Sequence, residues 1–225
     1  VRPDVQAFLA FLESIPGPKM HELDAPSARL PFVAMKELLD LPSGELAIKR
    51  DLSTPGGIKL RYYDARASRK AGPALVFFHG GGFVIGDLET HDGFCAEAAR
   101  KLDMPVIAVD YRLAPEHPFP AAPEDCEAAA RWIAGSPADL GLTVTSLVLA
   151  GDSAGGNLTI ATTHALRDRP AAAPVIAQWP IYPVVDENTA YGSYQQFGQG
   201  YLLTEDSMVW FMNHYAAAPE DPRNY

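Results

Sequence analysis

The stretch Leu147-Val-Leu-Ala-Gly-Asp-Ser-Ala-Gly-Gly-Asn157 decides the fold. Its apolar start predicts a buried strand, and the segment from Asn157 to Arg167 has the length and composition of a helix. Between them, Gly151-Asp-Ser-Ala-Gly155 matches the pattern G-x-S-x-G. After a strand and before a helix, this pattern is typical of a nucleophile elbow, a tight turn that exposes a serine, here Ser153. A glycine-rich turn without chemistry is the simpler interpretation, and the pattern alone does not exclude it.

The surrounding sequence alternates short apolar runs with helix-length segments. Strands are predicted at Leu75–Phe78, Val106–Val109, Leu147–Leu149 and Val175–Ile181, and helices at about 89–102, 122–135 and 155–167. Buried strands joined through helices indicate an α/β fold with a mostly parallel, doubly wound sheet, because such crossovers are almost always right-handed. Ligands bind such sheets at the carboxyl ends of the strands.

The N-terminal third of the chain carries different patterns. Apolar residues at helical spacing between Val5 and Ile15, ended by Pro16-Gly17-Pro18, predict a helix, and a second helical pattern follows up to Gly44. Residues 47–54 and 59–64 flank Pro55-Gly56-Gly57, which is typical of a β-hairpin. We therefore expect helices over residues 1–44 and the sheet to begin after them.

A second motif, His79-Gly-Gly-Gly-Phe83, directly follows the predicted strand Leu75–Phe78. Consecutive glycines let the backbone approach a ligand closely, so their N–H groups can bind an oxyanion. A phosphate-binding loop is disfavoured because the lysine of G-x-x-x-x-G-K-[ST] is absent. A third segment, Asp110 to Asp125, is rich in proline, and we expect a structural role in which Arg112, Glu116 and Asp125 brace the loops beside the site.

Together, His79-Gly-Gly-Gly-Phe83, Tyr111-Arg-Leu-Ala-Pro-Glu116 and Gly151-Asp-Ser-Ala-Gly-Gly-Asn157 resemble the hormone-sensitive-lipase-like branch of the α/β-hydrolase esterases. The resemblance implies an α/β-hydrolase fold with an N-terminal helical cap over residues 1–44, and a core over 45–225 that includes a cap-like segment at 190–215. It implies hydrolysis of short-to-medium acyl esters without a cofactor. Carried onto this chain, Ser153 is the nucleophile, and the oxyanion hole is formed by Gly81, Gly82 and Ala154.

The acid and the base of the mechanism are not evident in the sequence. In this family the order is serine, acid, histidine, and neither late motif is present, so we expect both residues, with the last strands and helices, beyond residue 225. His164 is excluded as base because it lies about 16 Å along the helix that starts at Ser153. Asp186 and His214 have the right order and form an alternative pair.

The predicted cap would wall an acyl pocket. Candidate substrate-binding residues, chosen for their place in the glycine motif or in the cap, are His79, Phe83, Phe32, Phe197 and Tyr201. The outer edge of strand Val175–Ile181 would be open in residues 1–225, so a complementing C-terminal segment or a second copy in a homodimer is the expected partner.

Composition narrows the function classes. With 18 Lys and Arg against 28 Asp and Glu, the formal charge is −10, which disfavours nucleic acid and anionic membranes as partners. No apolar run has the length of a membrane span, no signal peptide is evident, and Cys95 and Cys126 form no metal motif, so a cytoplasmic protein without a metal is expected. The alternatives to an active esterase are a catalytically incomplete fragment and a non-catalytic small-molecule binder on the same fold.

Overall fold

Six strands form one sheet in the order β1-β2-β4-β3-β5-β6 in this computed structural model, which describes residues 1–186 and 191–216. Strands β3 to β6 run parallel, whereas the β1–β2 hairpin pairs antiparallel with β4, so the sheet is mixed but mostly parallel, as predicted. The bounds are β1 (Ile48–Ser53), β2 (Lys59–Asp64), β3 (Ala71–Phe78), β4 (Val106–Asp110), β5 (Thr143–Asp152) and β6 (Val175–Ile181).

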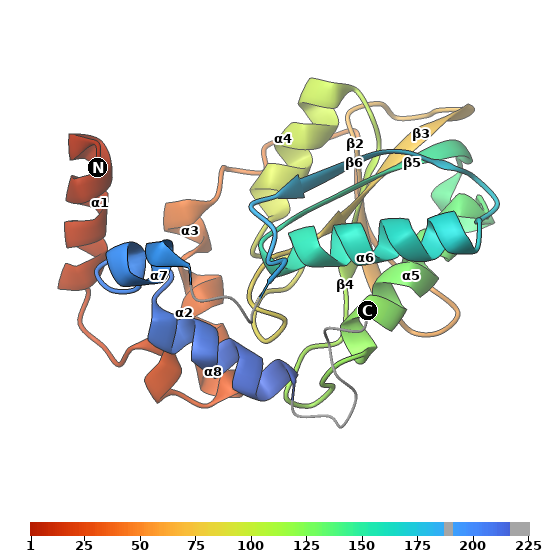
Figure 1. Ribbon diagram of the computed structural model, residues 1–225. Helices are drawn as coiled ribbons and strands as arrows, with labels where there is room; N and C mark the ends of the chain where they lie inside the picture. Colours follow the sequence, from red (N-terminus) through yellow and green to blue (C-terminus); the bar gives the residue numbers. More distant parts are fainter. Residues whose placement is uncertain (187–190, 217–225) are drawn as a thin grey trace.

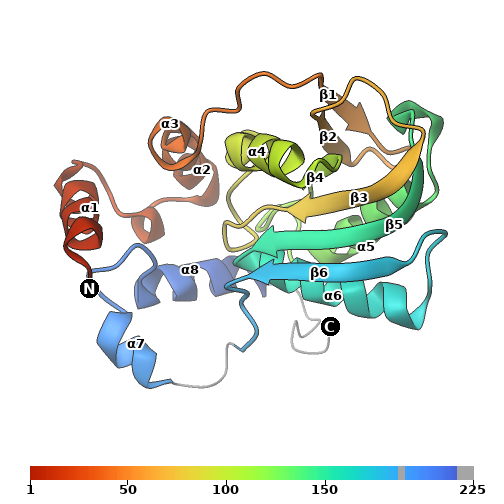
Figure 2. The same cartoon turned by 90° about the horizontal axis from the view of Figure 1, so that it is seen from above.

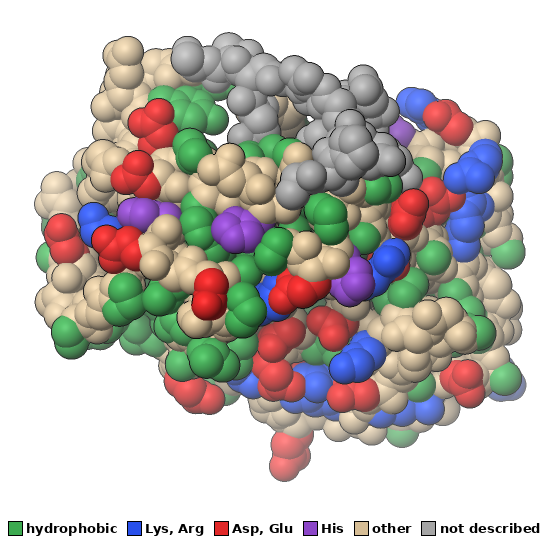
Figure 3. Space-filling view, turned by 90° about the horizontal axis from the view of Figure 1, so that it is seen from below, with side chains coloured by type: hydrophobic (Ala, Val, Ile, Leu, Met, Phe, Trp, Pro, Cys, Tyr) green, Lys and Arg blue, Asp and Glu red, His purple; other side chains and the backbone are tan. Residues whose placement is uncertain are grey.

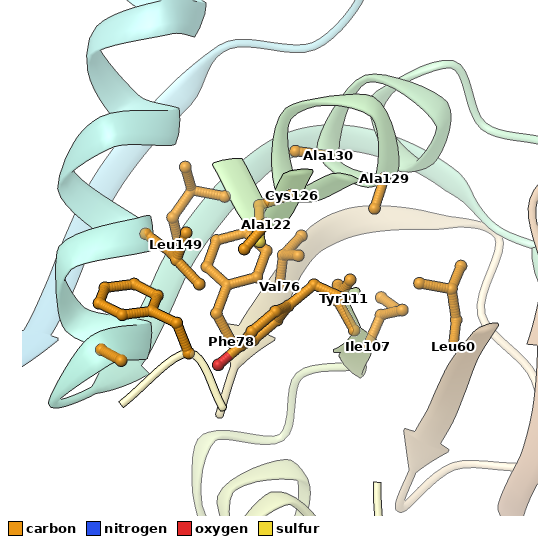
Figure 4. Packing of buried hydrophobic residues seen from close by; sticks show 14 of the residues in the cluster. Leu60, Val76, Phe78, Ile107, Tyr111, Ala122, Cys126, Ala129, Ala130 and Leu149 are labelled. Atoms are coloured by element: carbon orange, nitrogen blue, oxygen red, sulfur yellow. The ribbon is translucent and has the colours of Figure 1, made fainter. Parts of the chain in front are cut away.

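Helices cover the two faces of this sheet unequally (Figure 2). Helix α4 (Asp92–Leu102) lies on one face, and α5 (Ala121–Ala134) and α6 (Ala154–Asp168) lie on the other, with the short η2 (Ala138–Leu140) before β5. Because side chains alternate along a strand, Leu75 and Phe77 of β3 pack toward α4, while Val76 and Phe78 join the larger cluster on the opposite face. Figure 4 shows Val76 and Phe78 in that larger cluster with the small residues of α5.

The remaining helices gather at the carboxyl-end side of the sheet (Figure 1). They are α1 (Pro3–Ser14), η1 (Met20–Glu22), α2 (Ala25–Ala34), α3 (Lys36–Leu39), α7 (Gly192–Phe197) and α8 (Glu205–Tyr215). The end of α3 is tied to the core, since the carboxylate of Asp40 accepts the N–H groups of Gly93 (2.7 Å) and Phe94 (3.0 Å). The predicted helices of residues 1–44 are thus present. The division into a cap and a core stays a prediction, and residues 187–190 and 217–225 of the predicted core lie outside the described residues.

Strand β6 is an edge strand, paired with β5 alone among the described strands. Ile176 is 63% exposed and Trp179 is 47% exposed, whereas the strands at the centre of the sheet are buried. The face beside β6 therefore presents apolar side chains to solvent, in agreement with the open edge expected from the sequence.

No helix within the described ranges has both the length and the apolar character needed to cross a bilayer. In the same ranges, His, Cys, Asp and Glu side chains form no group of three or more placed to hold a metal ion. Seen from below, acidic and basic side chains are interspersed over the visible face (Figure 3).

Candidate active site

Ser153 lies at the turn between β5 and α6, where its backbone adopts φ 54° and ψ −116°. A non-glycine residue rarely takes this conformation, and surrounding contacts must hold it. The N–H of Ser153 donates to the carbonyl of Ile181 (2.9 Å), and the N–H of Val184 donates back to the carbonyl of Ser153 (3.3 Å). The end of β6 therefore holds the strained turn, and the turn–helix geometry expected of a nucleophile elbow is present.

The glycine loop after β3 presents N–H groups beside this turn. Gly81 and Gly82 have φ values of 118° and 58°, in the region that favours glycine, and a Cβ on Gly82 would overlap the ring of Phe211 in α8. Among the described residues, the N–H groups of Gly81 and Gly82 have no acceptor. The N–H of Ala154 belongs to the first turn of α6, whose N–H groups have no partner within the helix.

Asp152, directly before the nucleophile, connects the turn to the glycine loop. Its Oδ1 accepts the N–H of Gly80 (2.8 Å) and lies 3.2 Å from Nε2 of His91, just before α4. Burial works to raise the pKa of the Asp152 carboxyl, but the interactions with His91, His79 and the Gly80 N–H outweigh it, and the pKa lies below its ordinary value. His91 was not among the predicted site residues, because it precedes Ser153 in the chain and belongs to none of the three motifs.

His79 is buried under the glycine loop. Its ring stacks on Tyr111 with centroids 4.3 Å apart, Nδ1 donates to the carbonyl of Gly80 (2.7 Å), and the Tyr111 hydroxyl donates to the carbonyl of His79 (2.7 Å). Burial, followed by the charge of His91, lowers the pKa of His79 to about 4, so its imidazole is neutral at pH 7.

The candidate substrate-binding residues divide into three groups. His79 and Phe83 are 3% and 4% exposed, and Phe83 stacks on Tyr215 with ring centroids 3.8 Å apart, so both are buried. Phe197, at the end of α7, and Tyr201 pack edge to face at 5.2 Å. Phe32 lines a hollow of about 420 Å³ beside the sheet. The substrate-binding roles of all five residues remain predictions.

The walls of this hollow are mostly apolar and aromatic. They include Asp152, which directly precedes the proposed nucleophile in the chain. They comprise Phe32, Met35, Lys36, Asp40, Phe77, Thr90, His91, Phe94, Asp152, Ile181, Tyr182 and Leu202. A second, more open hollow of about 880 Å³ lies at the carboxyl end of β4 and is lined largely by charged side chains, including Arg29, Lys59, Asp110 and Arg112. The first hollow therefore suits an apolar ligand group better than the second.

The alternative acid and base are engaged by neighbours in the chain. Asp186 accepts the hydroxyl of Tyr191 (2.9 Å), while Nδ1 of His214 donates to the carbonyl of Trp210 (2.8 Å) and its ring packs on that indole at 4.4 Å. The assignment of Asp186 and His214 to catalysis stays a prediction.

The expected bracing of the loops is confirmed, with one additional residue. Asp125 accepts the backbone N–H of Arg112 (2.9 Å) and its guanidinium (2.8 Å). Glu116 pairs with Arg29 of α2, which also donates to the carbonyls of Val84 and Ala114. Arg29 thus joins α2 to the loops that follow β3 and β4.

Comparisons with known proteins agree with this geometry. Residues 75–225 match a family described as alpha/beta hydrolase fold. The ethyl acetate hydrolase of Pseudomonas putida is 37% identical over an alignment of 235 positions that covers 98% of this chain and 73% of that protein. The carboxylic ester hydrolase LipN of Mycobacterium tuberculosis is 37% identical over 223 residues, 95% of this chain and 53% of that protein.

Solved structures show the same similarity. A hyperthermophilic esterase from the archaeon Pyrobaculum calidifontis superposes with a TM-score of 0.88 at 36% identity, over 97% of this chain and 71% of that one. The chain therefore spans between about half and three quarters of the length of these relatives.

Proposed function

Since the chain belongs to the hormone-sensitive-lipase-like esterase family of the α/β-hydrolase fold, we propose that it is a carboxylic ester hydrolase with Ser153 as its nucleophile. One observation carries the proposal. Ser153 stands at the start of α6 in a strained turn, beside a glycine loop whose Gly81 and Gly82 N–H groups have no acceptor among the described residues. A serine next to unoccupied N–H donors suits acyl transfer, which needs a nucleophile and an oxyanion hole together.

The mechanism follows from this arrangement. Ser153 Oγ attacks the ester carbonyl while a histidine base takes its proton. The negative charge that develops on the carbonyl oxygen is stabilised by the N–H groups of Gly81, Gly82 and Ala154, and removal of one such donor costs about 2.7–4 kcal/mol in activation free energy. The alcohol leaves with the proton from the histidine, and water then hydrolyses the acyl-enzyme by the reverse proton transfers. No cofactor takes part in this scheme.

The substrate class follows from the hollow beside Asp152. Its volume of about 420 Å³ falls within the range of small-molecule pockets, and Phe32, Phe94 and Leu202 give it an apolar lining. We assign the acyl chain of a short-to-medium ester to this hollow. The cap supplies Phe32 and Leu202, so the cap helps to set the acyl length.

The test is covalent labelling by a fluorophosphonate together with hydrolysis of p-nitrophenyl acetate, butyrate and octanoate. We expect labelling at Ser153 alone, hydrolysis of the two shorter esters in preference to the octanoate, and loss of both activities in Ser153→Ala. A purified full-length protein that is not labelled and hydrolyses none of the three esters would overturn the proposed esterase function and favour a non-catalytic binder.

A second candidate is favoured by the exposed edge strand β6 and by the greater length of the relatives: residues 1–225 are a fragment that acts only when a further segment completes the sheet. The acid and the base would then lie in that segment. In this case residues 1–225 are inactive alone and gain activity when the segment is added. If Asp186 and His214 are instead the acid and base, residues 1–225 are active alone and His214→Ala abolishes hydrolysis.

A further inference from the structure

Asp152 links the two halves of the proposed active site. Its backbone is bonded directly to Ser153, and its side-chain Oδ1 accepts the N–H of Gly80, the residue before the oxyanion donors (2.8 Å). The approach is so close that a Cβ on Gly80 would overlap the Asp152 carboxylate. A shift of this carboxylate therefore shifts Gly80, and with it the N–H groups of Gly81 and Gly82 relative to Ser153.

Two polar neighbours hold the His91 ring beside Asp152. Thr90 Oγ1 lies 3.0 Å from Nδ1 of His91, and Nε2 of the same ring lies 3.2 Å from Oδ1 of Asp152. Because a carboxylate oxygen only accepts, Nε2 is the donor in the bond to Asp152. His91 is therefore oriented from both ring nitrogens, with its Nε2 directed at the carboxylate.

The pair is well placed to restrain the loop. The side chains of His91 and Asp152 are only 19% and 15% exposed, so solvent screens their interaction less than it screens a surface ion pair.

We propose that Asp152, held by His91, is a positioning residue that sets the distance between the Ser153 nucleophile and the oxyanion donors of the glycine loop. The proposal rests on the esterase function proposed above. It assigns roles to two side chains that are neither the nucleophile nor oxyanion donors, and it predicts that their main effect is on the chemical step rather than on substrate binding.

The first experiment compares His91→Gln with His91→Phe in steady-state hydrolysis of p-nitrophenyl acetate by the full-length protein. Gln keeps an N–H that can reach Asp152, whereas Phe has none. For His91→Phe we expect kcat to fall about 10- to 100-fold, less than the roughly 100- to 1,000-fold seen on loss of an oxyanion donor, because the donors are displaced but not removed, with KM within about twofold of wild type. His91→Gln should restore kcat to within about fivefold. The exposed His164 on α6 provides the matched control, and His164→Phe should leave both constants unchanged.

The second experiment measures the contact between Asp152 and Gly80 without relying on turnover. Amide hydrogen exchange at Gly80, followed by NMR, should be faster in Asp152→Ala and in His91→Phe than in wild type and unchanged in His164→Phe. Asp152→Asn, which keeps an acceptor oxygen but loses the charge, should show an intermediate rate. If His91→Phe does not fold, Asp152→Asn still tests the proposal, because it changes only one heavy atom of the side chain.

The outcomes are distinguishable. A wild-type protein that is not labelled by the fluorophosphonate and hydrolyses no ester refutes the esterase function. The exchange rates at Gly80 still test whether His91 and Asp152 hold the glycine loop in place. Unchanged exchange at Gly80 in Asp152→Ala, or equal kcat values for His91→Phe and wild type, would overturn the positioning role. Equal losses of kcat in folded His91→Gln and His91→Phe would overturn it as well, because only one of these variants lacks the donor.

Discussion

The indole N–H of Trp210 in α8 donates to the carbonyl of Leu23, just after η1, over 3.1 Å. This bond joins a helix near the end of the described chain to a segment near its start. The same helix places Phe211 against Gly82 and Tyr215 against Phe83 of the glycine loop. Helix α8 thus connects the N-terminal helices to the proposed oxyanion hole.

Replacement of Trp210 by Phe keeps an aromatic ring but removes the donor to Leu23. We expect the free energy of unfolding to fall by about 1 kcal/mol, as is typical for loss of one hydrogen bond. Urea titration followed by circular dichroism measures the change. Trp179→Phe on the exposed strand β6 is the control and should lose less; equal losses would show that the indole bond does not stabilise the fold.

Replacement of Gly82 by Ala should abolish fluorophosphonate labelling. The new Cβ would overlap the Phe211 ring, so the loop or α8 must move, and the oxyanion donors move with it. Gly57, in the β1–β2 turn, also has a positive φ (+88°), but a Cβ there meets nothing within 4 Å. Gly57→Ala therefore carries a similar backbone strain without the overlap, and it should label at the wild-type rate. A Gly82→Ala protein that labels normally would show that the loop tolerates the methyl group.

Stability should depend on pH through His79. Its pKa falls from an ordinary 6.5 to about 4 on folding, so between these values the unfolded state binds more protons than the folded state. The free energy of unfolding should therefore decrease as the pH falls from about 6.5 to about 4, by up to about 3 kcal/mol from this residue.

Urea denaturation at a series of pH values measures this slope. His79→Phe keeps a ring to stack on Tyr111 but cannot titrate, so it should show a shallower slope over this interval. His164→Phe, which removes an exposed histidine, should keep the wild-type slope. An unchanged slope in His79→Phe would assign the pH dependence to other groups.

Residues 1–225 expressed alone should self-associate through the open edge of β6. Ile176 is 63% exposed there, and edge strands with apolar side chains pair readily with other chains. Ile176→Lys should shift the protein toward the monomer in light scattering after size exclusion. Leu30→Lys, which adds the same charge at a 74% exposed position in α2, should not do so. Equal effects of both variants would attribute association to net charge.

Much of the fold was predictable because its signals are local. The elbow at Gly151–Gly155, the glycine loop and the apolar strand centres are each encoded in contiguous residues. Strand β3 begins at Ala71, earlier than predicted, because Gly72 and Pro73 are typical of a loop in sequence, while the structure accommodates them at an irregularity in the pairing with β5.

The site was less predictable where it depends on contacts between distant segments. His91 approaches Asp152 only because α4 begins beside the carboxyl ends of β3 and β5, and no spacing rule connects the two residues. The overlap that Phe211 would impose on Gly82 likewise depends on how α8 packs, although the aromatic pattern of residues 210–215 predicts a packed helix. Phe83 is in the glycine motif yet stacks on Tyr215, and nothing local separates a core aromatic from a pocket aromatic.

The hydrogen bond from Ser153 to Ile181 also concerns the order of events during synthesis. Ile181 leaves the ribosome after the whole of α6, so the nascent elbow lacks this partner until β6 has emerged and paired with β5. The bond that holds the strained serine conformation is therefore among the last contacts of the elbow to form.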